Sequence, residues 1–435
     1  MKRRLRIGAL ALAALGGCAL AECTDGTPAG PGGAAGATSS GGGGGGGVAG
    51  SGGATPTAGA CGPIGPWGEW PPASAPPREV VVLPPLFPRP DCGPGCRLLT
   101  TRYHASNMLA YQTRFGGRLM TSGPGALVDL DTGEEYDLGA PEPEPGSNTY
   151  SAALSGACLV QAYWFEQGDA RRGYVCETCL HANATRGLHF SEGVPCDPDW
   201  SGVITASDTF AVFGGGALGT WALDLRDGSK HTFATSNWLV WNYSLNEPYI
   251  VLSEGDGEVH LIDVRDWSDT NVTNDPALQW MAASDGKTIV WIDQRYHPGG
   301  GLETPANQEV VAYDIETQVT TRLTYTDAAK PSAKWDPAVE GDWVVWQDDR
   351  DSDAPNTMTD VVKNRVDIYG YNLATQKEYH ILGNQAGTLP ESAHGPHGLA
   401  AAVPRLYQGK LYVVGPYTYQ GSYHTEVWEF ALPTP

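Results

Sequence analysis

Basic residues are scarce in this chain of 435 residues, since 27 Lys and Arg stand against 49 Asp and Glu, for a formal net charge of −22. Four of the bases lie at the extreme N-terminus: Lys2, Arg3, Arg4 and Arg6. A surface that binds nucleic acid needs clustered Lys and Arg to displace counterions from phosphates. No such cluster follows the first six residues, so the composition argues against nucleic acid as a partner.

The apolar segment behind these bases is short. Residues 7–15 are rich in Ala and Leu and, after a basic start, have the form of an export signal. A permanent transmembrane helix needs about 20 apolar residues. We therefore expect a targeting signal and an exported protein.

Two cleavage sites lie at the end of this signal. Residues 15–18 (LGGC) resemble the bacterial lipobox, which implies a signal peptide over residues 1–17 and a lipid on Cys18. Ala19 rather than Asp follows, and the same resemblance then favours the outer membrane. The alternative is the small-x-small site at residues 19–21, which would give a secreted or periplasmic soluble protein. We predict an outer-membrane lipoprotein that meets the membrane through its lipid anchor only.

Residues 18–60 are mostly small and turn-forming, with an unbroken glycine run over residues 41–47. Such a segment cannot bury enough apolar surface to offset its ordering entropy. We predict a flexible tether over residues 18–60 and one folded domain over residues 61–435.

The folded part repeats an apolar–Asp/Asn–apolar triplet that is followed by turn residues and a polar strand. Copies lie at residues 128–130, 223–225, 262–264, 313–315 and 371–373, with a degenerate copy at 430–432. A more apolar segment precedes each copy, at residues 108–111, 210–213, 249–252, 288–291, 343–346 and 411–414, and residues 158–164 fill this place in a further unit. An apolar inner strand, a partner strand and a polar outer strand suit a propeller blade. We predict an all-β fold, a single β-propeller of about seven four-stranded blades.

The last repeat unit lacks a polar outer strand of its own. Upstream, residues 78–83 (REVVVL) form an isolated strand candidate bounded by prolines. We predict that this strand completes the last blade, because a ring then keeps no open edge there. The alternative is a proline-rich strap on the outside of the ring.

Residues 341–350 (GDWVVWQDDR) and 366–375 (VDIYGYNLAT) resemble the repeat of TolB-like β-propellers, in which a buried strand ends in a polar Asp-x-Arg turn. Residues 286–295 and 310–317 repeat the pattern. The resemblance implies a binding platform, with a protein or glycan of the cell envelope as partner. A fold does not fix an activity, so two alternatives stay open: a propeller-type polysaccharide lyase or hydrolase, and a purely structural envelope protein.

Aromatic residues fall into two groups. Trp291 and Trp346 hold equivalent repeat positions and are predicted to be blade core. Those within residues 238–243 and 417–423 lie near predicted loops, where exposed rings would stack on sugars or anchor a protein partner. Packing in the core or at the rim is the alternative for this second group.

Besides Cys18 and Cys23, seven cysteines are present. Cysteines in an exported chain indicate disulfides, although the pairing cannot be read from sequence. A zinc site or a redox pair at Cys176 and Cys179 is the alternative, but one Cys-x-x-Cys alone is a weak signal. The disulfide candidates are Cys61, Cys92, Cys96, Cys158, Cys176, Cys179 and Cys196.

Asp349, Asp351 and Asp353 have the spacing of oxygen ligands at the start of a calcium loop. Ala354 stands where an EF-hand requires Gly. We therefore expect the acids around Arg350 to shape the turn of the blade, with weak Ca²⁺ binding as the alternative.

His394 and His397 form the closest histidine pair, in a long loop before the last repeat unit. Histidines can ligate a metal or act as a general base, and some propeller enzymes that cleave acidic polysaccharides use them near the central mouth. The chain has no H-E-x-x-H, G-x-S-x-G or P-loop motif. We predict no catalytic residue and no cofactor, and this pair is the candidate of the enzyme alternative.

Overall fold

The computed structural model describes residues 61, 64–78, 81–83, 95–100, 115–121, 126–138, 148–167, 170–193, 202–214, 220–234, 243–253, 257–296, 308–327, 332–351, 366–383, 403–419 and 422–435. They belong to one compact unit, Gly59–Pro435. These residues form strands and turns, and among them no helix is long and apolar enough to cross a membrane. The predicted signal peptide, the tether and Cys18 lie outside the described residues.

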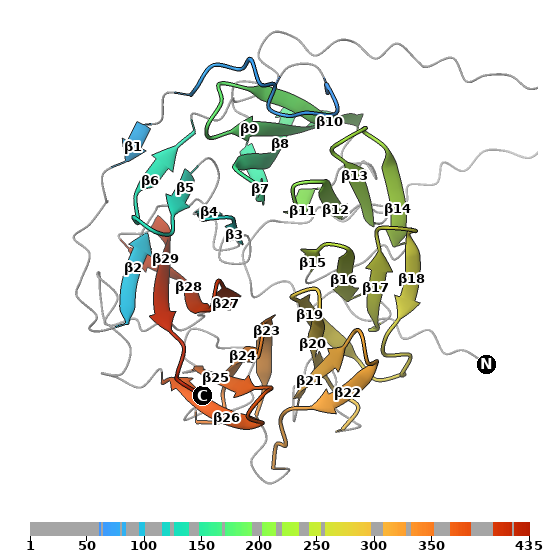
Figure 1. The fold of residues 1–435 in the computed structure, drawn as a ribbon, viewed down its shortest axis with the longest axis vertical. Helices are drawn as coiled ribbons and strands as arrows, with labels where there is room; N and C mark the ends of the chain where they lie inside the picture. Colours follow the sequence, from blue (N-terminus) through green and yellow to red (C-terminus); the bar gives the residue numbers. More distant parts are fainter. Residues whose placement is uncertain are drawn as a thin grey trace, which may run out of the picture. The chain divides into compact units, whose positions relative to one another are not determined.

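Seven antiparallel sheets stand around a common axis as the blades of a propeller (Figure 1). Five blades each consist of four consecutive strands, listed here from the first strand to the fourth. Blade 2 contains β7 (Asn148–Ser155), β8 (Cys158–Gln167), β9 (Ala170–Cys179) and β10 (Thr185–Gly193), and blade 3 contains β11 (Gly202–Ala206), β12 (Phe210–Gly214), β13 (Thr220–Asp224) and β14 (Lys230–Ala234). Blade 4 contains β15 (Tyr243–Asn246), β16 (Tyr249–Ser253), β17 (Val259–Asp263) and β18 (Ser268–Asn271), and blade 5 contains β19 (Gln279–Ser284), β20 (Thr288–Asp293), β21 (Glu309–Asp314) and β22 (Val319–Arg322). Blade 6 contains β23 (Lys334–Glu340), β24 (Trp343–Asp348), β25 (Asp367–Asn372) and β26 (Lys377–Leu382).

Blades 1 and 7 combine strands from distant parts of the chain. Blade 1 contains, from inside to outside, β3 (Phe115–Gly116), β4 (Leu119–Thr121), β5 (Ala126–Asp129), β6 (Glu135–Asp137) and β1 (Val81–Leu83). Blade 7 contains β27 (Val403–Tyr407), β28 (Lys410–Tyr419), β29 (Ser422–Ala431) and the outermost β2 (Cys96–Thr100). The predicted seven-bladed, all-β propeller is confirmed.

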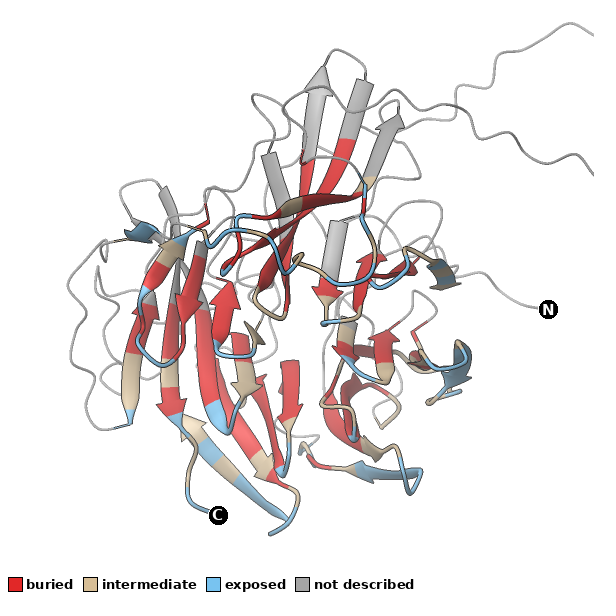
Figure 2. Cartoon of the chain, turned by 45° about the horizontal axis from the view of Figure 1, so that its top comes forward, coloured by how far each residue is buried: buried red, intermediate tan, exposed pale blue. Residues whose placement is uncertain are grey.

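A separate apolar cluster fills each contact between neighbouring blades. The second strand of a blade serves both of its neighbours, since side chains alternate between the two faces of a strand. In β24, Trp346 packs toward blade 5 and Val345 packs toward blade 7. Trp291 and Trp346 are almost fully buried, which confirms them as core. Figure 2 shows how buried residues dominate the strands within each blade while exposed residues gather on outer strands and turns.

In blades 2 to 7 the apolar runs form the second strand, which corrects the prediction that they are innermost. The run at residues 108–111 lies outside the described residues. The runs at residues 288–291 and 343–346 lie in β20 and β24, whereas β19 and β23 precede them on the axial side. Both inner strands contain an irregularity of register, after Trp280 in β19 and after Trp335 in β23. Such bulges interrupt the alternation by which a strand is recognised in sequence.

The strand that completes the last blade is β2, so the assignment of residues 78–83 to that place was wrong. The strand β2 pairs with β29 from Cys96↔Phe430 onward, whereas β1 pairs with β6 and extends blade 1. Burial explains the difference. Leu98 and Leu99 are buried in the clusters toward blade 6 and blade 1 respectively, while the valines of β1 are more than half exposed.

Cys61 and residues 64–78 form a strap along the outside of blades 3 and 2. Trp67 packs on Gly228 in a turn of blade 3, where φ is +77° and a Cβ atom would come within 2.3 Å of the indole. Further along, Arg186 of β10 lies between Trp67 and Trp70, with its guanidinium carbon 5.3 Å and 4.8 Å from the two ring centres. Arg186 also donates to the buried Glu177 over 2.7 Å. The strap is therefore bound to blades 2 and 3 by specific side-chain contacts.

Two disulfides lie within the described residues, and both involve blade 2. Cys61 of the strap is bonded to Cys176, and Cys158 is bonded to its register partner Cys179. Cys176 and Cys179 thus belong to different disulfides, which leaves no thiolate pair for the zinc or redox alternative. Cys96 is disulfide-bonded as well, whereas Cys92 and Cys196 lie outside the described residues.

The connections between strands divide between two faces of the ring. First-to-second and third-to-fourth connections are tight turns, such as residues 285–287 and 315–318 in blade 5, and we call their side the turn face. The other connections leave from the opposite side because the strands are antiparallel. In blades 5 and 6 these are long, at residues 294–308, 323–333, 349–366 and 383–402. We call this side the long-connection face.

Candidate functional site

The second strand of blade 6 ends in a buried carboxylate with three donors. The indole N–H of Trp346 donates to Asp348 Oδ2 over 3.1 Å, while Arg350 donates through Nη2 over 2.6 Å and through its backbone N–H over 3.0 Å. Burial by itself would raise the pKa of Asp348, but Lys334 and Arg350 hold it below its usual range. The acid and the arginine organise the turn, as the repeat pattern predicted.

Blade 5 repeats this arrangement without the run of acids that suggested calcium. Trp291 donates to Asp293 Oδ2 over 2.8 Å, and the backbone N–H of Arg295 donates to Asp293 Oδ1 over 2.8 Å. A buried carboxylate is tolerated when it is paired and hydrogen-bonded. The two blades therefore begin their long connection between the second and third strands with the same structural turn.

The calcium candidates point to separate partners. Asp349 is buried, and its Oδ1 accepts the backbone N–H of Ala333 over 2.7 Å. Asp351 accepts a short hydrogen bond from the Tyr369 hydroxyl, and Asp353 lies outside the described residues. In the part of the chain that the structure describes, no three or more His, Cys, Asp or Glu side chains gather as metal ligands do. Weak Ca²⁺ binding there stays a prediction.

A buried lysine joins blade 6 to the connection that leads into it. Lys334 Nζ lies 2.6 Å from Thr326 Oγ1, 3.0 Å from Ser332 Oγ and 3.8 Å from Asp348 Oδ2. Burial lowers the pKa of Lys334, whereas the nearby Asp348 acts against this shift. Because an ammonium has three N–H donors, the two hydroxyl oxygens and the nearby carboxylate account for the charge and the hydrogen bonds of Lys334. We therefore assign Lys334 a structural role.

A stack of the half-buried Tyr296 and Arg322 with the exposed Tyr325, here called the Tyr–Arg stack, lies on the long-connection face of blade 5. The guanidinium carbon of Arg322 is 4.2 Å from the ring centre of Tyr296 and 4.4 Å from that of Tyr325. Arg322 also donates to Glu309 Oε1 and to the carbonyl of Thr324, both over 2.8 Å. Tyr325 is 75% exposed, more than any other large apolar side chain in the described residues. The arginine fixes an aromatic ring at the surface.

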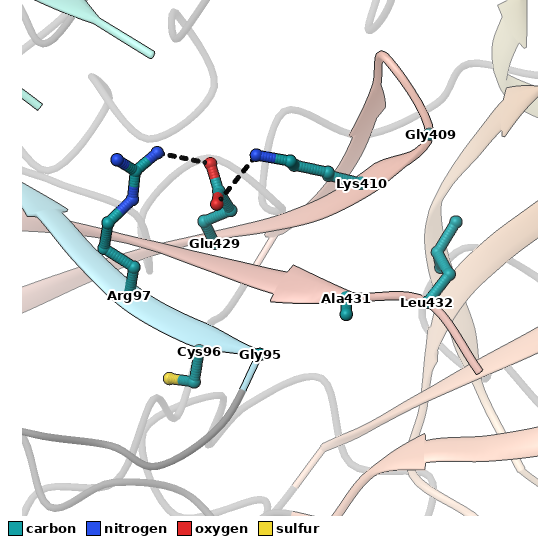
Figure 3. Close-up of a pocket in the computed structure, with 8 residues that line it drawn as sticks. All are labelled: Gly95, Cys96, Arg97, Gly409, Lys410, Glu429, Ala431 and Leu432. Atoms are coloured by element: carbon teal, nitrogen blue, oxygen red, sulfur yellow. Dashed lines mark hydrogen bonds and ion pairs between the residues drawn. The ribbon is translucent and has the colours of Figure 1, made fainter. Parts of the chain in front are cut away.

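A pocket of about 400 Å³ lies on the turn face at the outer part of blade 7 (Figure 3). Glu429 accepts hydrogen bonds there from Arg97 over 2.8 Å, from Lys410 over 3.0 Å and from the Tyr412 hydroxyl over 3.2 Å. Burial tends to raise the pKa of Glu429, but the two cations hold it below its ordinary value. The lining residues are Gly95, Cys96, Arg97, Gly409, Lys410, Glu429, Ala431 and Leu432.

A second buried acid lies in the inner strand β23. Asp336 takes a positive φ of 47° at the bulge of this strand. Gln347 Nε2 donates to Asp336 Oδ2 over 3.1 Å, while Oδ1 has no partner. Burial raises the pKa of Asp336 to about 6, and the charge of Arg405 acts in the opposite direction. At the corresponding bulge of blade 5 the residue is the apolar Met281.

Other sequence-predicted sites are not brought together by the described residues. His394 and His397 lie outside them, between β26 and β27, and the side chains at residues 238–243 and 417–423 are likewise not described. Sequence reasoning missed the Tyr–Arg stack and the charged residues of the pocket. An alignment of the repeats by strand register would have found Lys410, because no other blade has a charge at its position.

No protein-family model and no curated protein matches the chain. Among solved structures, an oligogalacturonate lyase from Vibrio parahaemolyticus is similar at 11% identity with a TM-score of 0.51, over 81% of this chain and 98% of that one. An oligogalacturonate lyase in complex with manganese matches at 15% identity and a TM-score of 0.49, over 83% and 99%. BamB from Moraxella catarrhalis matches at 10% identity and a TM-score of 0.40, over 78% and 99%.

Similarity at these identities concerns the fold and carries no activity across. The fold is nevertheless established by the seven sheets, their closure and the length over which the lyase from Vibrio parahaemolyticus matches. The chain is a seven-bladed β-propeller, the architecture that its TolB-like repeats imply.

Proposed function

We propose that this propeller is a non-enzymatic binding platform of the cell envelope, and that a protein or glycan docks on its long-connection face. The observation that carries the proposal is the Tyr–Arg stack. Tyrosine and arginine are the residues that most often dominate binding energy at interfaces, and tyrosine also stacks on sugar rings. A side chain that is already fixed before binding loses little conformational entropy when a partner arrives.

The long connections support the same face. Binding residues in folds of this kind are carried by loops on a rigid scaffold, and in blades 5 and 6 the long connections leave from the side on which Tyr325 is exposed. The proposal includes export and a lipid anchor on Cys18, which rest on the sequence alone. The lyase or hydrolase alternative gains no support from the described residues.

The test compares two exposed positions of blade 5. A photo-crosslinking amino acid at position 325 should give specific adducts in intact cells, while the same group at Val319, which is 55% exposed, should give none. With the partner so identified, or with a glycan chosen from an array, Tyr325→Ala should weaken binding by about 30-fold, the effect of an interface hot spot. Val319→Ala should leave binding unchanged.

Two results would count against the platform. Equal crosslinking at both positions, together with no saturable binding to any glycan, would favour a purely structural protein. Turnover of a polysaccharide by the purified chain would favour the enzyme, and its loss in His394→Ala or His397→Ala would place the site in the connection between β26 and β27.

A further inference from the structure

Of the charged residues around the pocket, Lys410 is peculiar to blade 7. The pair of Arg97 and Glu429 has a counterpart in blade 2, where Arg186 and Glu177 hold the same register positions. Strand register aligns the blades: Tyr412↔Glu429 corresponds to Val345↔Gly370 in blade 6 and to Val290↔Ala312 in blade 5. In blades 1, 3 and 4 the residues at the position of Glu429 are Leu127, Ala222 and Leu261. A blade therefore folds without a charge at this place.

The hollow itself follows from how the ring closes. In the other blades a tight turn joins the third strand to the fourth, but β29 and β2 come from opposite ends of the folded domain and no turn joins them. Ala431 N–H still donates to Gly95 O over 2.8 Å, so the strands stay paired to their ends. Where a turn would fill the space, a pocket remains.

In blades 1, 3, 4, 5 and 6 a side-chain oxygen occupies the position that Ala431 holds at the pocket, while in blade 2 this position holds the disulfide-bonded Cys179. The oxygen-bearing residue ends the third strand and accepts hydrogen bonds from the turn, as Asp129, Asp224, Asp263, Asp314 and Asn372 do. Three of these acids also form an ion pair with an arginine, with distances of 2.5 to 2.8 Å. Five of the six other blades thus have an acceptor oxygen at this place, in four of them that of an acid, and Ala431 supplies none.

Cationic donors face the vacant position. Lys410 is the register partner of Ala431 and its side chain is 46% exposed. Its ammonium has three N–H groups, of which one is donated to Glu429. Arg97 donates to Glu429, Leu130 O and Asp131 O, while its Nε–H has no partner. Among the residues that line the pocket, two cations stand against one carboxylate. A further carboxylate, that of Glu340, accepts the backbone N–H groups of Gln408 and Gly409 beside it.

We propose that this pocket binds a small anion that carries a carboxylate or phosphate group, which takes the place of the turn acid found in four other blades. Lys410 is the principal contact of the bound anion, and Arg97 keeps Glu429 in an ion pair so that its carboxylate does not point at the anion. The site lies on the turn face and is independent of the platform proposed for the opposite face, so the two proposals stand or fall separately.

Calorimetric titration of the full chain with phosphate and with succinate tests the site, with the neutral succinamide as control. A dissociation constant of about 1 mM is expected for at least one anion at low salt, with no heat from succinamide. Binding of phosphate alone or of succinate alone would identify the group that the pocket takes. Absence of binding by both anions would overturn the proposal.

Variants show whether the anion lies in this pocket. Lys410→Ala should weaken binding about tenfold or more, as expected for loss of a charge-assisted hydrogen bond, while Lys377→Ala, an exposed lysine on the turn face of blade 6, should not. Ala431→Asp restores the acid found in four other blades and should abolish binding by occupying the site, whereas Ala431→Asn should retain part of it. A folded Lys410→Ala protein with unchanged affinity would overturn the assignment.

Discussion

Two buried aspartates of blade 6 show how neighbours decide the state of a carboxyl group. Asp348 has Lys334, Arg350 and an indole N–H beside it, and its pKa falls despite full burial. Asp336 lies on the adjacent strand with only the neutral Gln347 in hydrogen-bond contact, and its pKa rises to about 6. One acid is a charged part of a turn, and the other is held most easily in its neutral form.

Asp336 should make the fold less stable as the pH rises. Its folded-state pKa of about 6 lies above the ordinary aspartate value of 3.8, so ionisation is penalised in the fold from about pH 4 upward, and the penalty is complete above pH 6. The loss amounts to at most about 3 kcal/mol. In Asp336→Asn the free energy of unfolding should therefore decline less between pH 4.5 and pH 7.5, as measured by urea denaturation at both values.

The matched control for this experiment is Asp342→Asn, at an exposed turn of the same blade. It should keep the pH dependence of the parent protein. Equal slopes in the parent and in Asp336→Asn would show that Asp336 titrates in the fold as it does in the unfolded chain.

The two N-terminal strands differ in what they contribute to the ring. Leu98 and Leu99 of β2 enter two different clusters between blades, whereas Val82 of β1 is 53% exposed. Leu98→Ala and Leu99→Ala should each lower the free energy of unfolding by about 2 to 5 kcal/mol through cavity formation. Val82→Ala should change it by less than about 0.5 kcal/mol. Similar losses for all three variants in denaturant titrations would contradict the closure by β2.

Elements with a strong pattern could be predicted from the sequence, and those without one could not. The I-V-W run of β20, the V-V-W run of β24 and the polar strands β22 and β26 were found because burial or exposure of a whole strand shows in composition. The strand β2 reads Cys-Arg-Leu-Leu-Thr and has no such pattern. Its role depends on pairing across more than 300 residues, which no local signal records. The pocket arises in the same way, from side chains that only the closed ring brings together. The Tyr–Arg stack forms within blade 5 and its connections, from single residues that follow no repeat pattern.

At the scale of the whole molecule, the acidic ring is expected to be held at a membrane by its N-terminus. Labelled palmitate should be incorporated into the full chain in a bacterial host, and Cys18→Ala should remove the label and release the protein from the membrane fraction. The Cys23→Ala variant is the control and should remain labelled. A labelled Cys18→Ala protein would contradict lipidation at this residue.

The bond between Cys61 and Cys176 determines where a pulling force would enter this fold. Tension applied to the chain ahead of residue 61 passes through that crosslink into the third strand of blade 2. The strap, β1 and β2 all follow Cys61 in the chain, so they lie outside the path of the force. The closure between β2 and β29, which backbone pairing, burial and the ion pair of Arg97 with Glu429 hold together, is therefore protected from forces that act on the N-terminal segment.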